Sequence, residues 1–237
     1  TVTFTPQIVV NGVTSTLAPV TLAPGQTVTS APITVPLTAT GGTVTANVTL
    51  ASVPDSNLAN NTSTQVSGAL FADVTTSVDL PASAPAGSIV SVTVTFTNSA
   101  VGASASTASA VVGTVTLSNG QVQTYTLGQL APGASTTQVF TTTVPATTGT
   151  TALSATSTVA TATPESNTAN NSATDSLVVL FADPGVSVNP IPSGTPGSTV
   201  TTSVTLSNNG STTVTFTPQI VVNGVTSTLA PVTLAPG

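Results

Sequence analysis

The chain has 237 residues and a formal net charge of −6, because it contains six Asp and Glu residues and no Lys, Arg or His. Without cations a protein cannot neutralise nucleic-acid phosphates and is not drawn to anionic lipid, so neither partner is expected. The chain also lacks Cys, which excludes disulfides and thiol chemistry. Its longest apolar run, residues 177–182, is too short to cross a bilayer, so membrane insertion is not expected either.

The first segment, TVTFTPQIVVNGVTSTLAPVTLAPG, recurs without a substitution at residues 213–237. A shared fold tolerates conservative exchanges, so perfect identity indicates a recent tandem duplication or a window cut from a longer periodic chain. The offset (213 − 1 = 212) predicts a 212-residue repeat, with residue 1 an arbitrary cut through it. Within the segment, TVTFT and QIVV are strand-like, and the Asn-Gly at residue 11 predicts a turn.

Strand patterns dominate the rest of the chain. Residues 89–97 alternate Val90, Val92, Val94 and Phe96 with Ser and Thr, which is typical of a half-buried strand packed on a second sheet. Residues 200–206 repeat the pattern, so we expect Val200 to face inward with its apolar neighbours. No stretch has a helical period of useful length, and the β-branched Thr residues suit strands. The sequence therefore predicts an all-β protein.

Two related modules lie within the 212-residue period. The triplets Phe-Ala-Asp at residues 71–73 and 181–183 lie 110 residues apart, as do PDSNLANNTS from Pro54 and PESNTANNSA from Pro164. Turn spacing gives each module about seven strands, the number and size of an immunoglobulin-like β-sandwich. We expect residues 71–181 to be one complete module, residues 182–237 the front part of a second, and residues 1–70 its back part. Half a sandwich exposes its inner face and needs completion.

Three motifs carry a family resemblance: PAGSIVSVTVTFTN, LGQLAPGAS and PESNTANNSAT. In this order they resemble bacterial and archaeal surface repeats known as domain of unknown function number eleven, and the related CARDB group, the cell-adhesion-related domain of bacteria. The resemblance implies tandem immunoglobulin-like sandwiches, export and a place on cell surfaces. It implies no catalytic residues.

The residue types needed for most catalytic mechanisms are absent from this chain. General acid–base work and activation of a hydroxyl nucleophile need a well-placed base such as His or Lys, and both are absent. The carboxylates are sparse: Asp55, Asp73, Asp79, Glu165, Asp175 and Asp183. The closest pair in sequence, Asp73 and Asp79, would lie roughly 20 Å apart along an extended strand, too far to act together. We predict no enzyme, no catalytic residue and no cofactor.

The two acidic Asn-rich loops offer oxygen atoms that could bind a cation. One contains Asp55, Asn57, Asn60 and Asn61, and the other contains Glu165, Asn167, Asn170 and Asn171. Calcium prefers such oxygens, but one carboxylate per loop is a poor ligand set. Turns in which these side chains bond nearby backbone N–H groups are the favoured reading, so no metal residue is predicted.

The leading functional hypothesis is a structural repeat of an extracellular fibre, filament or stalk on a cell surface. Its partner would be itself, through head-to-tail modules and lateral contacts, and Phe71 and Phe181 are the candidates for packing the module junctions. One alternative is an adhesin segment that binds a glycan or protein through its loops. Another is a set of separate subunits that polymerise by strand exchange. A covalent array would continue the 212-residue period, whereas a strand-exchange polymer would not.

Overall fold

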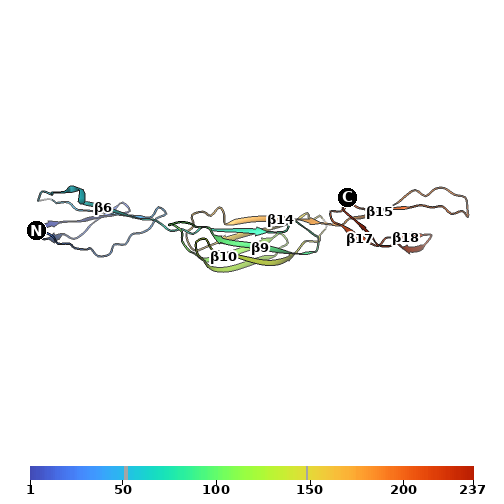
Figure 1. The fold of residues 1–237 in the computed structure, drawn as a ribbon, viewed down its shortest axis with the longest axis horizontal. Helices are drawn as coiled ribbons and strands as arrows, with labels where there is room; N and C mark the ends of the chain where they lie inside the picture. Colours follow the sequence, from blue (N-terminus) through green and yellow to red (C-terminus); the bar gives the residue numbers. More distant parts are fainter. Residues whose placement is uncertain (51–52, 148) are drawn as a thin grey trace.

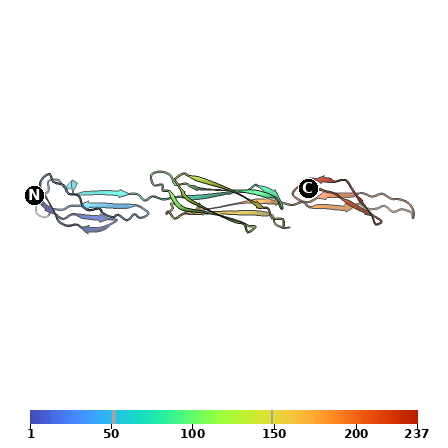
Figure 2. The same ribbon diagram turned by 90° about the horizontal axis from the view of Figure 1, so that it is seen from below.

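Three all-β units follow one another along the long axis of the molecule (Figures 1 and 2). The computed structural model describes residues 1–50, 53–147 and 149–237. We refer to residues 1–70 as the N-terminal unit, residues 71–181 as the central module and residues 182–237 as the C-terminal unit. In the part of the chain described, the helical content is a single 3-10 turn, η1 (Leu58–Asn60). The prediction of an all-β protein is therefore confirmed.

The central module is a closed β-sandwich. Its strands are β7 (Val74–Asp79), β8 (Ser83–Pro85), β9 (Ile89–Asn98), β10 (Ala108–Leu117), β11 (Val122–Leu130), β12 (Ser135–Thr143), β13 (Ala152–Ala160) and β14 (Ser172–Leu180). One sheet has the order β11-β10-β13-β14-β8 and the other has the order β12-β9-β7. All pairs are antiparallel except β14 with β8, which run parallel. This is an immunoglobulin-like arrangement, as the alternation and turn spacing predicted.

Alternating side chains of both sheets form the core of the central module. Val92, Val94 and Phe96 of β9 are fully buried, as the period of two predicted, and Val90 is half-buried. Leu153 of β13 belongs to the same core. The Phe96 ring lies against Gly113 of β10 so closely that a Cβ there would fall 2.2 Å from the ring. The glycine is therefore needed for space, because any side chain would displace the ring.

The four most deeply buried polar side chains of the central module, Thr76, Asn98, Thr142 and Ser157, are hydrogen-bonded. Asn98, at the end of β9, is fully buried and accepts from the N–H groups of Asp73 and Ala100 while donating to the carbonyls of Ser106 and Leu130. It thereby connects the start of β7 to the end of β11. Between the sheets, the hydroxyls of Thr76 and Ser157 lie 2.6 Å apart.

The N-terminal unit repeats only one of the two sheets. Its strands are β1 (Val2–Phe4), β2 (Gln7–Val10), β3 (Val13–Thr16), β4 (Val20–Leu22), β5 (Gly42–Asn47) and β6 (Thr62–Ser67). The four-stranded sheet has the order β3-β2-β5-β6, and β1 pairs with β4. Asn11 and Gly12 both have positive φ, which is the turn that an Asn-Gly pair favours between two strands.

The C-terminal unit consists of separate strand pairs. They are β15 (Pro184–Val188) with β16 (Val204–Asn208), β17 (Val214–Phe216) with β20 (Val232–Leu234), and β18 (Gln219–Val222) with β19 (Val225–Thr228). The expectation that residues 200–206 form one inward-facing strand is wrong in its first half. Strand β16 begins only at Val204, and Val200 is 44% exposed, because this stretch lacks the neighbouring strand that β12 supplies to β9.

Candidate functional site

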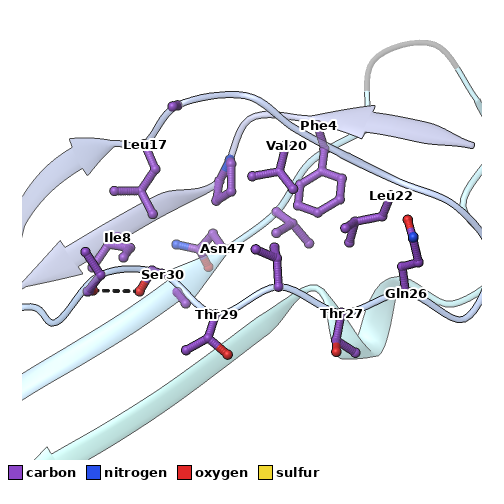
Figure 3. Close-up of a pocket in the computed structure, with 16 residues that line it drawn as sticks. Phe4, Ile8, Leu17, Val20, Leu22, Gln26, Thr27, Thr29, Ser30 and Asn47 are labelled. Carbon is purple, nitrogen blue, oxygen red and sulfur yellow. Dashed lines mark hydrogen bonds between the residues drawn. The ribbon is translucent and has the colours of Figure 1, made fainter.

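The inner face of the N-terminal unit is an open apolar groove of about 630 Å³. Figure 3 shows Phe4, Leu17, Val20 and Leu22 pointing into it. Residues 26–31 run along the other side of the groove without forming a strand. In the central module the corresponding space is filled by the buried side chains of β7 and β9. The groove is thus an uncovered sandwich core and offers an apolar docking surface.

A second groove, of about 810 Å³, lies on the C-terminal unit. Val188, Ile191, Val204 and Ile220 are among its apolar lining residues. Val188 is 63% exposed, whereas Val78, at the corresponding place in the central module, is 9% exposed. The molecule therefore carries an uncovered apolar surface in each of the units that flank the central module. The internal repeat did not indicate which side chains would line these two grooves.

The Asn-rich loop of the N-terminal unit is built as a turn. The Asp55 carboxylate accepts the Asn57 backbone N–H at 2.9 Å and the Asn61 side-chain amide at 2.9 Å. These two hydrogen bonds, in that order of importance, lower the pKa of Asp55 below its ordinary value. The Asn57 side chain caps η1 by accepting from the N–H of Ala59. The carboxylate and amide oxygens are therefore directed at N–H donors of their own loop.

The corresponding loop of the central module ties β14 to β7. Glu165 accepts the side-chain amide of Asn171 at 3.0 Å and the backbone N–H of Val74 at 3.0 Å. Asn170 donates to the carboxylate of Asp73 at 2.9 Å. These contacts join the two sheets of the sandwich, which is a role in the fold that loop sequence alone did not reveal.

The remaining carboxylates also lie in structural positions. Asp73 precedes β7 and Asp79 ends it, so the extended strand separates them as predicted. Asp175 accepts the backbone N–H of Leu80 at 2.7 Å, and the N–H of Asp183 donates to Asn208. Across the described residues, three or more His, Cys, Asp or Glu side chains nowhere gather in a way that could hold a metal ion. In the same residues there is no helix of the length and apolarity needed to cross a membrane.

The predicted junction residues lie where the units meet. Phe181 packs against the edge of the central core, and its backbone N–H and carbonyl both bond to Ser211 of the C-terminal unit. Gly210 approaches the same segment so closely that a Cβ would lie 2.4 Å from the Phe181 carbonyl oxygen. Phe71 is held differently, by backbone bonds to Ser104 and Ser106 within the central module. Of the pair, Phe181 is the one that joins two units.

Residues 71–175 match the CARDB family. A solution NMR structure of the CARDB domain of the PF1109 protein from Pyrococcus furiosus is similar, with 20% identity and a TM-score of 0.39, covering 46% of this chain and 96% of that domain. A crystal structure of the same domain in complex with di-metal ions has 21% identity and a TM-score of 0.39, covering 48% and 94%. No curated protein sequence matches the chain.

The fold therefore defines a protein of immunoglobulin-like β-sandwich modules. Residues 71–175 of its central module match the CARDB family, and the predicted family resemblance is confirmed for this part of the chain. CARDB domains are non-catalytic β domains typical of extracellular and surface proteins.

Proposed function

We propose that the chain is a non-catalytic structural repeat of an extracellular fibre, filament or stalk on a cell surface. The observation that carries the proposal is the identity of two 25-residue segments that lie 212 residues apart, together with the structure of these two segments. Residues 1–25 and 213–237 are identical, and both form the same strand pairs: Val2↔Leu22 recurs as Val214↔Leu234, and Gln7↔Thr16 recurs as Gln219↔Thr228. Placing the last segment of one copy on the first segment of the next would keep these strand pairs and add further units to the chain.

The shape of the molecule supports this reading. The two identical segments lie in the outer units, on either side of the central module along the long axis (Figures 1 and 2). Each added copy would therefore lengthen the rod. Such arrays gain stability from modules and from contacts between neighbours. Lys–Asn isopeptide bonds cannot brace this fibre because the chain has no Lys, so burial and backbone ladders must provide its stiffness.

An adhesive role through the loops is less well supported. The Asn-rich loops use their polar side chains for bonds within the fold, and aromatic residues are only 3% of the chain. A glycan platform normally needs exposed aromatic faces, and the sole Tyr, Tyr125, packs against the central core. We therefore place any adhesive surface second to the structural role.

The test is to produce chains with one, two and three 212-residue periods and measure their length by electron microscopy and small-angle X-ray scattering. We expect a rod whose length increases by the same amount with each period and whose width stays constant. Compact particles, or a flexible string with no fixed repeat, would contradict the proposal. The mass of the native chain under denaturing conditions separates the two forms of fibre: many times 22.9 kDa for a covalent array, and near 22.9 kDa for separate subunits.

A further inference from the structure

We propose that residues 182–208 of one copy of this repeat close the open sandwich of residues 1–70 of another copy. This arrangement places β15 where β7 lies in the central module, residues 193–195 where β8 lies, and β16 where β9 lies. The inference rests on the proposed function, since it names the contact that would join successive copies, and it identifies the occupant of both apolar grooves as a second copy of this chain.

The N-terminal unit lacks the strands that the proposed occupant supplies. Its sheet order β3-β2-β5-β6 reproduces β11-β10-β13-β14 of the central module but ends before the equivalent of β8. In the central module, β8 pairs with the outer edge of β14 through Val178↔Ser83, and the N–H of Ala86 donates to the carbonyl of Leu180 at 2.8 Å. Among the described residues, the corresponding edge of β6 has no partner strand. An open strand edge next to an open apolar face favours addition of a strand.

The C-terminal unit carries the missing strands in the required register. The register of β7 with β9 runs from Val74↔Asn98 to Val78↔Val94. The register of β15 with β16, 110 residues later, is the same and runs from Pro184↔Asn208 to Val188↔Val204. The buried Asn is repeated as well, because Asn208 is 2% exposed and donates to the carbonyl of Leu234 just as Asn98 donates to Leu130. These residues already have the shape of the half-sandwich that would cover the N-terminal unit.

The duplicated segment makes the exchange between copies favourable. In the C-terminal unit, residues 213–237 pack on β16 through Leu234 and through the N–H of Gly237, which donates to the Asn208 carbonyl. Residues 1–25 of a second copy have the same sequence, so they can replace residues 213–237 and form the same contacts. Residues 1–25 of that second copy continue into its residues 26–70. The exchanged arrangement therefore keeps the contacts of the original and adds those of residues 26–37, β5 and β6.

The partner has to be a second copy because the two half-sandwiches of one chain lie on opposite sides of the central module (Figure 2).

Residues 26–37 show what is gained on pairing. They form no strand in this structure, whereas the equivalent β12 pairs with β9 from Ser135↔Thr97 to Thr143↔Ile89. In the closed arrangement these residues would pair with the free edge of β16.

The experiment uses the natural absence of Cys from the full 237-residue chain. By homology with Val178↔Ser83, Gly68 of one copy should lie beside Ser193 of the other, with both side chains on the solvent side. Neighbouring strands are about 4.8 Å apart, which suits the ~4.4–6.8 Å Cα separation of a disulfide. A side chain at Gly68 meets no atom within 4 Å. The matched control is Thr64→Cys, on the same outward side of β6 but four residues away, or about 13 Å.

Gly68→Cys and isotope-labelled Ser193→Cys chains are mixed and oxidised with oxidised glutathione, and mixed dimers are identified by intact mass under denaturing conditions. Because docking raises the effective concentration of the two thiols, we expect at least about tenfold more mixed dimer than with Thr64→Cys and Ser193→Cys. Sedimentation velocity of the unmodified chain gives a second readout that needs no substitution, and end-to-end association should increase with concentration.

Equal yields for the two pairs would overturn the inference, whether the face stays free or takes a glycan or another protein. If chains of several periods form rods but the Gly68→Cys and Thr64→Cys pairs give equal yields of mixed dimer, this contact is overturned and the fibre proposal stands. Register-specific cross-linking of chains that fail to build rods would support the contact and contradict the fibre. A chain that remains monomeric and gives no mixed dimer would contradict this contact, whereas the fibre proposal would be contradicted by chains of one, two and three periods that do not lengthen regularly.

Discussion

Replacing Asn98 with Ala is expected to destabilise the central module severely. The side chain is fully buried and makes four hydrogen bonds, to the N–H groups of Asp73 and Ala100 and to the carbonyls of Ser106 and Leu130, at 2.9–3.3 Å. Each such bond contributes about 1 kcal/mol net, and an unsatisfied buried group costs about 1–3 kcal/mol. The expected loss is therefore about 4 kcal/mol of the free energy of unfolding.

The assay is thermal and urea unfolding followed by the fluorescence of Tyr125. This is the only Tyr in a chain without Trp, so the signal reports on the central module alone. For a domain of this size, about 4 kcal/mol corresponds to a decrease in Tm of roughly 15–30 °C. The matched control is Asn208→Ala, which removes the homologous side chain from the C-terminal unit. It should leave the Tyr125 transition unchanged. A loss below about 1 kcal/mol in Asn98→Ala would refute the reasoning, because it would equal the value of a single bond.

Three further predictions concern single positions. Gly113→Ala places a Cβ against the Phe96 ring, and we expect a loss of about 1–3 kcal/mol from overpacking, measured by urea unfolding; an unchanged midpoint would mean that the ring moves freely. Asn61→Ala removes one of the two hydrogen bonds that lower the pKa of Asp55, so an NMR titration should show that pKa rise toward its ordinary value; because the bonded form is ionised, the loop loses stability as pH falls through the folded-state pKa. Partial burial raises the pKa of Tyr125, so the neutral phenol is favoured and the module loses stability as pH rises through that pKa. Ultraviolet titration of the phenol should give a higher midpoint for the folded chain than for the chain in urea. Equal midpoints would contradict this prediction.

The candidate interface was only partly predictable from sequence. The 110-residue internal repeat led to the expectation of a complete module and two parts of another. It did not indicate that β6 and β16 would each keep a free edge, or that the Asn-rich loop around Glu165 would join the two sheets through Val74. These features depend on hydrogen bonds between residues distant in the chain, which composition and spacing do not encode.

The two identical 25-residue segments separate what the sequence determined from what the tertiary structure decided. Both form the same hairpin around an Asn-Gly turn, with positive φ at Asn11 and again at Asn223, because the turn and the pairing of adjacent residues are local. Their burial differs. Ile8, beside β5, is 6% exposed, whereas its counterpart Ile220 is only half-buried. Val10 is half-buried, whereas its counterpart Val222 is 61% exposed, because β18 has no strand in the place of β5. Local sequence fixes a strand and its turn, but burial requires a second surface, and only distant residues can provide it.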